Sequence, residues 1–100
     1  MIQVSMKDIV EAYALIQPYI MKTPLIYSKP TSDRTGSEVW FKMDNLQSIG
    51  AYKIRGAMNN MMSLRGEEVK KGVVAASAGN DSQAVAYGGR PSGTSAVWCG

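Results

Sequence analysis

Hydrophobic residues follow a helical spacing in two parts of the chain. Residues 6–19 come directly after Ser5, which has capping-box spacing with Asp8, and their apolar positions recur every three or four residues. The same spacing returns over residues 53–64. Both segments are therefore predicted to be amphipathic helices, and the second is predicted to carry Lys53 in its first turn.

Other stretches have the composition of strands. Residues 39–43 are rich in aromatic and branched side chains, and residues 73–76 are apolar without alternation, which is typical of a parallel strand covered on both faces. Residues 94–98 are predicted to form a further strand, and Thr23-Pro24-Leu25 a turn or extended segment. This order of elements predicts an α/β fold with an open, mostly parallel sheet and flanking helices.

Three polar or glycine-containing segments complete the prediction. Residues 28–34 are expected to form a short helix that ends at Gly36. Residues 65–72 are interpreted as a short helix or a linker, since glycines flank a charged run. Residues 82–87 are expected to be helical, and Gly88-Gly89-Arg90-Pro91 to break that helix.

The composition narrows the class of protein. Apolar residues make up 45% of the 100 residues, which is ordinary for a globular protein, and the net charge of +3 comes from scattered side chains, so neither nucleic acid nor a membrane is an expected partner. One cysteine and no histidine argue against a disulfide framework and a structural metal site. Without a signal-peptide pattern or a membrane-spanning run, a cytoplasmic location is the expectation.

One lysine lies in a setting that suggests chemistry. In Gly50-Ala51-Tyr52-Lys53-Ile54-Arg55-Gly56-Ala57, glycines on both sides of Lys53 allow sharp turns and close approach to a flat ligand. A partly desolvated amine at a helix start is biased toward the neutral form that attacks a carbonyl. For a lone lysine, however, a solvated surface position is the commoner role.

A second motif follows the strand predicted at residues 73–76. Ser77-Ala78-Gly79-Asn80 lies between that strand and a helix start, where backbone N–H groups can hold an anion such as a substrate carboxylate. The alternative is an ordinary strand-to-helix turn with Asn80 or Ser82 as the N-cap, and spacing alone favours it. The lysine motif earlier in the chain shifts the balance toward a binding role.

Together the two motifs resemble the pyridoxal-phosphate enzymes of the threonine/serine dehydratase family, the fold-type II group that includes serine racemase. The resemblance covers Asp44-Asn45-Leu46-Gln47, the lysine motif, and residues 71–80, with weaker agreement at residues 23–25 and 83–87. It implies a two-lobed fold, with residues 1–64 in the lobe that carries the lysine, 65–72 as a linker, and 73–100 as the start of a smaller lobe.

The resemblance also implies residue roles. Lys53 would hold pyridoxal 5'-phosphate covalently and then act as the base at the substrate α-carbon, while the Tyr52 ring would pack on the pyridine face. Asn80 would hydrogen-bond the ring hydroxyl, and the segment Ser77, Ala78, Gly79 and Asn80 would bind the carboxylate of an amino-acid substrate. The implied reaction is α,β-elimination of water from L-threonine or L-serine, which yields a 2-oxo acid and ammonia.

Several alternatives stay open at this point. Serine racemases often carry a serine where this chain has Ala78, so Ala78 favours elimination, but a racemase-like enzyme is an alternative. So are an inactive, truncated α/β remnant and an anion-binding module. Members of the resembled family are longer, with a phosphate loop beyond position 100; the chain is therefore expected to be an N-terminal fragment, inactive alone, of a dimeric or tetrameric protein.

Four residues depart from the resembled pattern, namely Ile49, Ala51, Asp81 and Ala84. The most consequential is Asp81, which stands where histidine is usual. A carboxylate close to two bound anions would weaken binding more than tenfold, since a like-charge pair about 6 Å apart costs roughly 2–3 kcal/mol. Pointing away, the same carboxylate would be favourable at a helix N-terminus.

Overall fold

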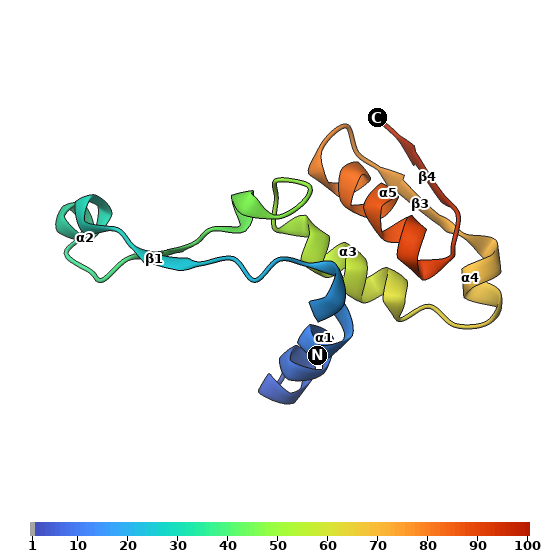
Figure 1. Ribbon diagram of the computed structural model, residues 1–100, viewed down its shortest axis with the longest axis horizontal. Coiled ribbons are helices and arrows are strands. Elements are labelled where there is room, and N and C mark those ends of the chain that lie inside the picture. The colour runs from blue at the N-terminus through green and yellow to red at the C-terminus, as the bar shows by residue number, and fades with distance from the viewer. Residues whose placement is uncertain (1) are drawn as a thin grey trace.

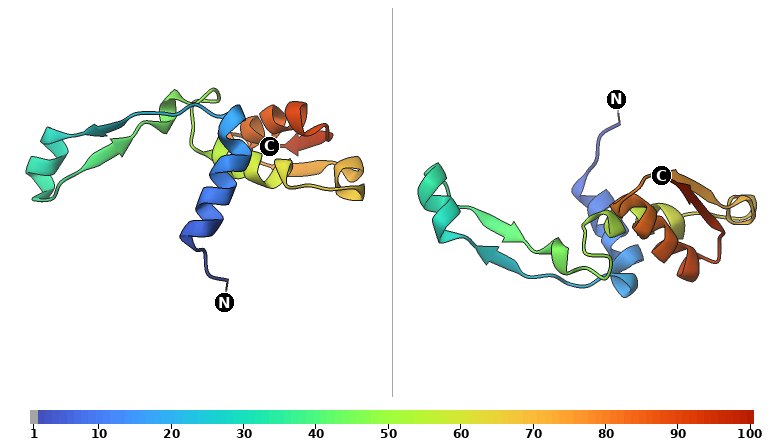
Figure 2. Two further views of the ribbon diagram at one scale, coloured as in Figure 1. Left: turned by 60° about the horizontal axis from the view of Figure 1, so that its bottom comes forward. Right: turned by 90° about the horizontal axis from the view of Figure 1, so that it is seen from above.

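The computed structural model describes residues 2–100, which form a packed body and a long arm (Figure 1). The arm, residues 21–46, extends away from the body and ends in α2, as the further views also show (Figure 2). The elements are α1 Met6–Ile16, η1 Gln17–Tyr19, β1 Leu25–Tyr27, α2 Lys29–Thr35, β2 Trp40–Lys42, η2 Asp44–Leu46, α3 Lys53–Met62, α4 Glu67–Lys71, β3 Val73–Ala76, α5 Asn80–Ser92 and β4 Ala96–Cys99, where η denotes a 3-10 turn.

The predicted α/β class is confirmed, but the strands form two separate pairs. In the arm, β1 and β2 are antiparallel, with Leu25 opposite Lys42. In the body, β3 and β4 are parallel, with Val73 opposite Ala96. Within residues 2–100 no ladder joins the pairs, because the arm carries β1 and β2 away from the body.

The helix starts follow the local sequence signals. The capping box of α1 is confirmed: the Asp8 amide donates to Ser5 Oγ over 3.2 Å, and the Ser5 amide donates to the Asp8 carboxylate over 2.7 Å. The helix predicted at residues 28–34 is confirmed as α2, and Gly36 ends it in the left-handed conformation with φ 70°. As predicted, Lys53 is the first residue of α3.

The core of the body lies where α1, α3 and α5 meet. Ile54 and Met58 on α3 are completely buried, and together with Ile16 of α1 they form the centre of the hydrophobic cluster. Tyr87 of α5 packs against this cluster. The face of α1 that points away from α3 leaves Met6, Ile9 and Val10 exposed, so α1 contributes to the core only through its last turn.

The predicted break at residues 88–91 is wrong, because α5 continues through them to Ser92. Gly88 is buried, and a Cβ added there would lie 2.7 Å from Met61 Sδ and 3.3 Å from Met58 Sδ. The glycine thus allows α5 to approach α3 closely, and the packing outweighs the low helix propensity of glycine, about 1 kcal/mol. Pro91 lies in the last turn, just before the C-cap Gly93.

The expectation that β3 is covered on both faces is also wrong. Ala75 is buried, whereas Val74 is 81% exposed, so α5 covers one face of the β3–β4 pair and the other is open in the described part of the chain. Residues 65–72, interpreted as a short helix or a linker, contain the short helix α4, and the flanking helices α3 and α5 pack directly on each other. The division into two lobes is not tested by this packing and stays a prediction.

No helix within residues 2–100 has the length and apolar character needed to cross a bilayer. The cytoplasmic location stays a prediction.

Gly88→Val is expected to lower the free energy of unfolding by about 1–3 kcal/mol, since a larger side chain overpacks the contact with Met58 and Met61. The matched control is Gly56→Val on α3, where an added Cβ meets nothing within 4 Å. The control is expected to change stability by less than about 0.5 kcal/mol. Urea unfolding followed by circular dichroism measures both, and equal effects would show that the α3–α5 contact is not tight.

Candidate active site

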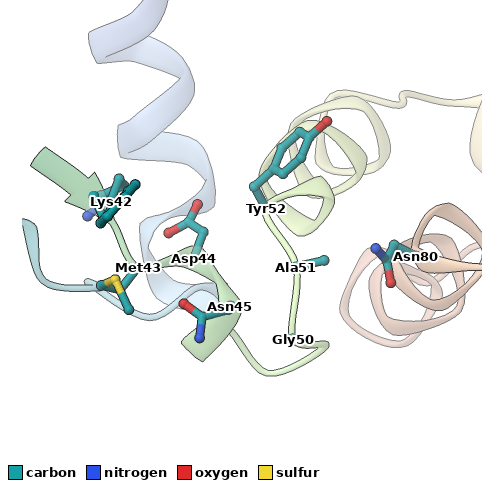
Figure 3. A pocket seen from close by; sticks show the side chains of 9 residues that line it. Lys42, Met43, Asp44, Asn45, Gly50, Ala51, Tyr52 and Asn80 are labelled. Carbon is teal, nitrogen blue, oxygen red and sulfur yellow. The ribbon is translucent and has the colours of Figure 1, made fainter. Parts of the chain in front are cut away.

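A cavity of about 720 Å³ lies between the base of the arm and the start of α5. Residues from three separate segments line it: Phe41, Lys42, Met43, Asp44 and Asn45 at the end of β2 and in η2, Gly50, Ala51 and Tyr52 before α3, and Asn80 at the start of α5 (Figure 3). Two of the sequence-predicted site residues, Tyr52 and Asn80, are thus brought to one cavity.

A tight turn positions the segment before α3. The Gly50 amide donates to the Gln47 carbonyl over 2.7 Å, and Gly50 has φ 74°, a conformation that other residues rarely adopt. The chain then passes through Ala51, which is buried, to Tyr52, which is 67% exposed. Figure 3 shows the Asn80 side chain facing the Gly50–Ala51 segment from the opposite side of the cavity.

Lys53 follows Tyr52 directly but is not one of the residues that line the cavity. Its side chain is exposed in the structure. The expectation of a partly desolvated amine is therefore wrong for residues 2–100: this position of the first turn of α3 faces outward, whereas Ile54, the next residue, faces the core. The structure does place Lys53 one residue from the cavity wall.

The Ser77–Asn80 segment is divided between two cavities. Ser77 and Ala78 line a second cavity of about 520 Å³ beside Trp98 and Cys99, and Gly79 lines neither cavity. Only Asn80 reaches the first cavity. The structure therefore does not bring the four predicted carboxylate-binding residues together around one cavity.

Local hydrogen bonds explain the shape of this segment. The Gly79 amide donates to Ser77 Oγ over 3.1 Å, so that amide is already used within the chain. Gly79 is the N-cap of α5, and no side chain caps this helix end. The alternative with Asn80 or Ser82 as N-cap is thus wrong, and Ser82 Oγ instead donates to the Gly79 carbonyl over 2.7 Å.

Asp81 lies in the first turn of α5 and is not among the residues that line either cavity. A carboxylate in that turn interacts favourably with the positive end of the helix dipole. Of the two roles that the sequence left open, this position supports the helix N-terminal one.

The most connected polar group at the cavity is Asp44, to which the sequence analysis assigned no role. Arg55 Nε donates to Asp44 Oδ2 over 2.6 Å and Arg55 Nη2 to Asp44 Oδ1 over 3.1 Å, a bidentate ion pair. Thr23 Oγ1 also donates to Asp44 Oδ1, over 2.5 Å. Only 10% of the Asp44 side chain is exposed, so this pair is much better shielded than a surface ion pair.

The Arg55 guanidinium holds the pKa of the Asp44 carboxyl well below its ordinary range, against the opposing effect of burial. Asp44 raises the pKa of Arg55 in turn. The pairing spans η2 and α3, so no short-range spacing rule predicts it. Its one sequence signal is that both residues fall within the segments that resemble the dehydratase family.

A family model described as pyridoxal-phosphate dependent enzyme matches residues 16–99. The chain belongs to this family. Serine racemase of Dictyostelium discoideum is 46% identical over 87 residues, which are 87% of this chain and 27% of that protein. L-threonine ammonia-lyase of Thermotoga maritima is 48% identical over 83 residues, 83% of this chain and 21% of that protein.

The fold agrees with this family. The solved structure of maize serine racemase matches with a TM-score of 0.83 at 39% identity, over 95% of this chain and 30% of that one. The chain spans about a quarter of the length of these two curated relatives.

Pyridoxal phosphate is the cofactor of this family. Two residues at the first cavity fit the ring of that group: the Tyr52 ring offers an aromatic face, and Asn80 offers an amide that can donate to a ring oxygen. Lys53, the residue after Tyr52, offers a primary amine outside the cavity lining. The fit concerns the ring alone, because the cavity lining contains no cluster of amides or cations suited to a phosphate.

Acid is expected to destabilise the protein partly through Asp44. Because its pKa is lower in the folded than in the unfolded chain, its stabilising contribution is complete above about pH 5 and is lost as the pH falls below about 4. Asp44→Asn should flatten the stability profile in that range and, at pH 7, lower the free energy of unfolding by about 1.5–3 kcal/mol.

The control for this prediction is Asp33→Asn, which breaks the exposed Lys29–Asp33 pair, whose side chains are 76% and 62% exposed. It is expected to change stability by less than about 1 kcal/mol at pH 7. Denaturant unfolding at a series of pH values measures both variants. An unchanged acid slope in Asp44→Asn would contradict the assigned role of the Asp44–Arg55 pair.

Proposed function

We propose that Lys53 holds pyridoxal phosphate, and that the chain provides the cofactor-lysine segment of an enzyme that eliminates water from L-threonine or L-serine. The observation that carries the proposal is the convergence of Tyr52 and Asn80 on one cavity directly before Lys53. The supporting comparison is the membership in the pyridoxal-phosphate dependent enzymes, with L-threonine ammonia-lyase among the relatives.

Each residue has a part that its position allows. The Tyr52 ring would pack against one face of the cofactor ring and orient it. Asn80, at the start of α5, would donate a hydrogen bond to the ring oxygen. When bound, the cofactor supplies an electron sink for the α-carbon of the substrate.

Lys53 moves the proton in this proposal. Its ε-amino group would take the α-proton of the substrate and pass a proton to the β-hydroxyl, which would then leave as water. The resulting enamine tautomerises and is hydrolysed to a 2-oxo acid and ammonia. In this scheme the Ser77–Asn80 segment and the amides at the start of α5, which no side chain caps, would hold the substrate carboxylate, since the N-terminus of a helix attracts anions.

Racemisation of serine is the second candidate, because serine racemases of Dictyostelium discoideum and maize match the chain at 46% and 39% identity. Both reactions begin with the removal of the α-proton, and they differ in the next step. Racemisation needs a second proton donor on the opposite face of the α-carbon, and the methyl group of Ala78 cannot be one. This residue favours elimination.

Assembly as a dimer or tetramer is also part of the proposed function.

Lys53→Ala is expected to abolish the binding of pyridoxal phosphate to the chain. Lys42, the lysine that lines the cavity, does not replace Lys53, because its Nζ donates a hydrogen bond to the Thr23 carbonyl. Binding is measured from the visible absorbance of the protein-bound cofactor after gel filtration. The matched control is Lys29→Ala, which removes an exposed lysine from α2 at the far end of the arm. Equal absorbance in both variants would show that the cofactor reacts with surface lysines at random.

Ala78→Ser is expected to shift the reaction toward racemisation. It is best measured in a chimera in which this chain replaces the matching segment of the Thermotoga maritima L-threonine ammonia-lyase, because the chain spans 21% of that protein. With L-serine, the ratio of D-serine to 2-oxo acid should rise by about 100-fold or more, since 100-fold is the lower end of the range for a positioned proton donor. A chimera with Ala78 that racemises as fast as it eliminates would contradict the proposed reaction.

A further inference from the structure

The helix that carries Lys53 begins without any of the usual stabilising groups. Its N-cap, Tyr52, makes no side-chain capping bond, and its first turn contains no acidic residue. Instead the turn contains Lys53 and Arg55, two cations at the end of the helix where the dipole is positive. From its own sequence, the first turn of α3 is therefore expected to fray.

Asp44 supplies the missing negative charge from outside the helix. Its two carboxylate oxygens accept from Nε and Nη2 of Arg55 over 2.6 and 3.1 Å. Because this contact is a fork of two bonds to a planar group, it fixes the orientation of Arg55 as well as its distance. The side chains of Arg55 and Asp44 are only 29% and 10% exposed, so water and salt screen the contact little.

The carboxylate is itself held in place. Thr23 Oγ1 and Gln47 Nε2 donate to Asp44 Oδ1 over 2.5 and 3.4 Å. Gln47 is buried, and its side-chain amide makes two bonds of 2.8 Å with the backbone of Met21, one to the N–H and one to the carbonyl. We define the Asp44 network as Thr23, Asp44, Gln47 and Arg55. It joins the two chain segments at the base of the arm, one before β1 and one after β2, to α3.

We propose that Arg55, held by Asp44, is a positioning residue for Lys53. By fixing the first turn of α3 against the base of the arm, the Asp44 network sets the backbone direction from which the Lys53 side chain leaves, two residues before Arg55. This inference rests on the proposed function of Lys53. It assigns to Asp44 and Arg55 no contact with cofactor or substrate.

The test compares Asp44→Asn, Arg55→Lys and the double variant with the unchanged chain. Arg55→Lys keeps the charge but removes the fork, so it separates orientation from simple charge neutralisation. Asp33→Asn in the exposed Lys29–Asp33 pair is the matched control. Far-ultraviolet circular dichroism selects the conditions under which every variant is folded.

Two measurements are made on each variant. Hydrogen exchange at the amide of Ala57, whose helical partner is the carbonyl of Lys53, reports the first turn of α3 without any cofactor. Reaction with pyridoxal phosphate, followed by borohydride reduction and peptide mass spectrometry, reports the share of label on Lys53 against the other lysines of the chain.

The expected result is faster exchange at Ala57 in Asp44→Asn, with the Lys53 share reduced by at least about tenfold, as small displacements of a reacting group cost that much or more. Arg55→Lys should also lower the share, and the double variant should be no worse than the more affected single variant, since both act through one contact. Asp33→Asn should change neither measurement.

Two results overturn the inference in different ways. If exchange rises in Asp44→Asn or Arg55→Lys while the Lys53 share stays the same, the network stabilises the helix without positioning the amine. If Lys53 in the unchanged chain takes no more label than the other lysines, the proposed function fails, and the inference fails with it. The exchange data from the same samples then still show whether Asp44 holds the first turn.

Discussion

The close approach of α5 to α3 is the contact on which the site depends. Ile54 and Met58 bury one side of α3, and Gly88 leaves room for Met61 Sδ where any other residue would place a Cβ within 2.7 Å. Because α5 is held against α3 in this way, its first residue, Asn80, comes to the cavity formed by the turn before Lys53. A contact near the C-terminal end of α5 thus sets the position of a polar group at its N-terminal end.

The arm is attached to the body by polar contacts more than by hydrophobic packing. Its aromatic pair, Tyr27 and Trp40, has ring centroids 5.2 Å apart but remains 43% and 52% exposed. The radius of gyration, 16.1 Å, exceeds the value of about 13 Å for a compact chain of this length. Within the described residues, the base of the arm is fixed by Asp44 and its partners. An ion pair normally contributes little to stability, but this one fixes the base of the arm to α3.

The sequence predicted elements well where the signal is local and poorly where contacts between elements decide. The Ser5–Asp8 capping box, the Gly36 C-cap and the start of α3 at Lys53 all depend on residues a few positions apart, and all are confirmed. The continuation of α5 through Gly88 depends on methionines of another helix. Asp44 pairs with Arg55 across an irregular turn, and no hydrophobic periodicity or capping spacing predicts that contact. Trp40 is exposed for the same reason: its surroundings depend on the direction that the arm takes.

The exposure of Lys53 is a consequence of this division between the arm and the body. An amine at the start of a helix is shielded only if another element passes over that turn, and among residues 2–100 the arm leaves the body on the side of Asp44 instead. The network therefore fastens the turn from one side and leaves the other open, as a site that must admit both a cofactor and an amino acid requires. The backbone of this turn can be well ordered while the amine stays accessible, because Arg55 is the residue that anchors the turn and Lys53 is the residue left exposed.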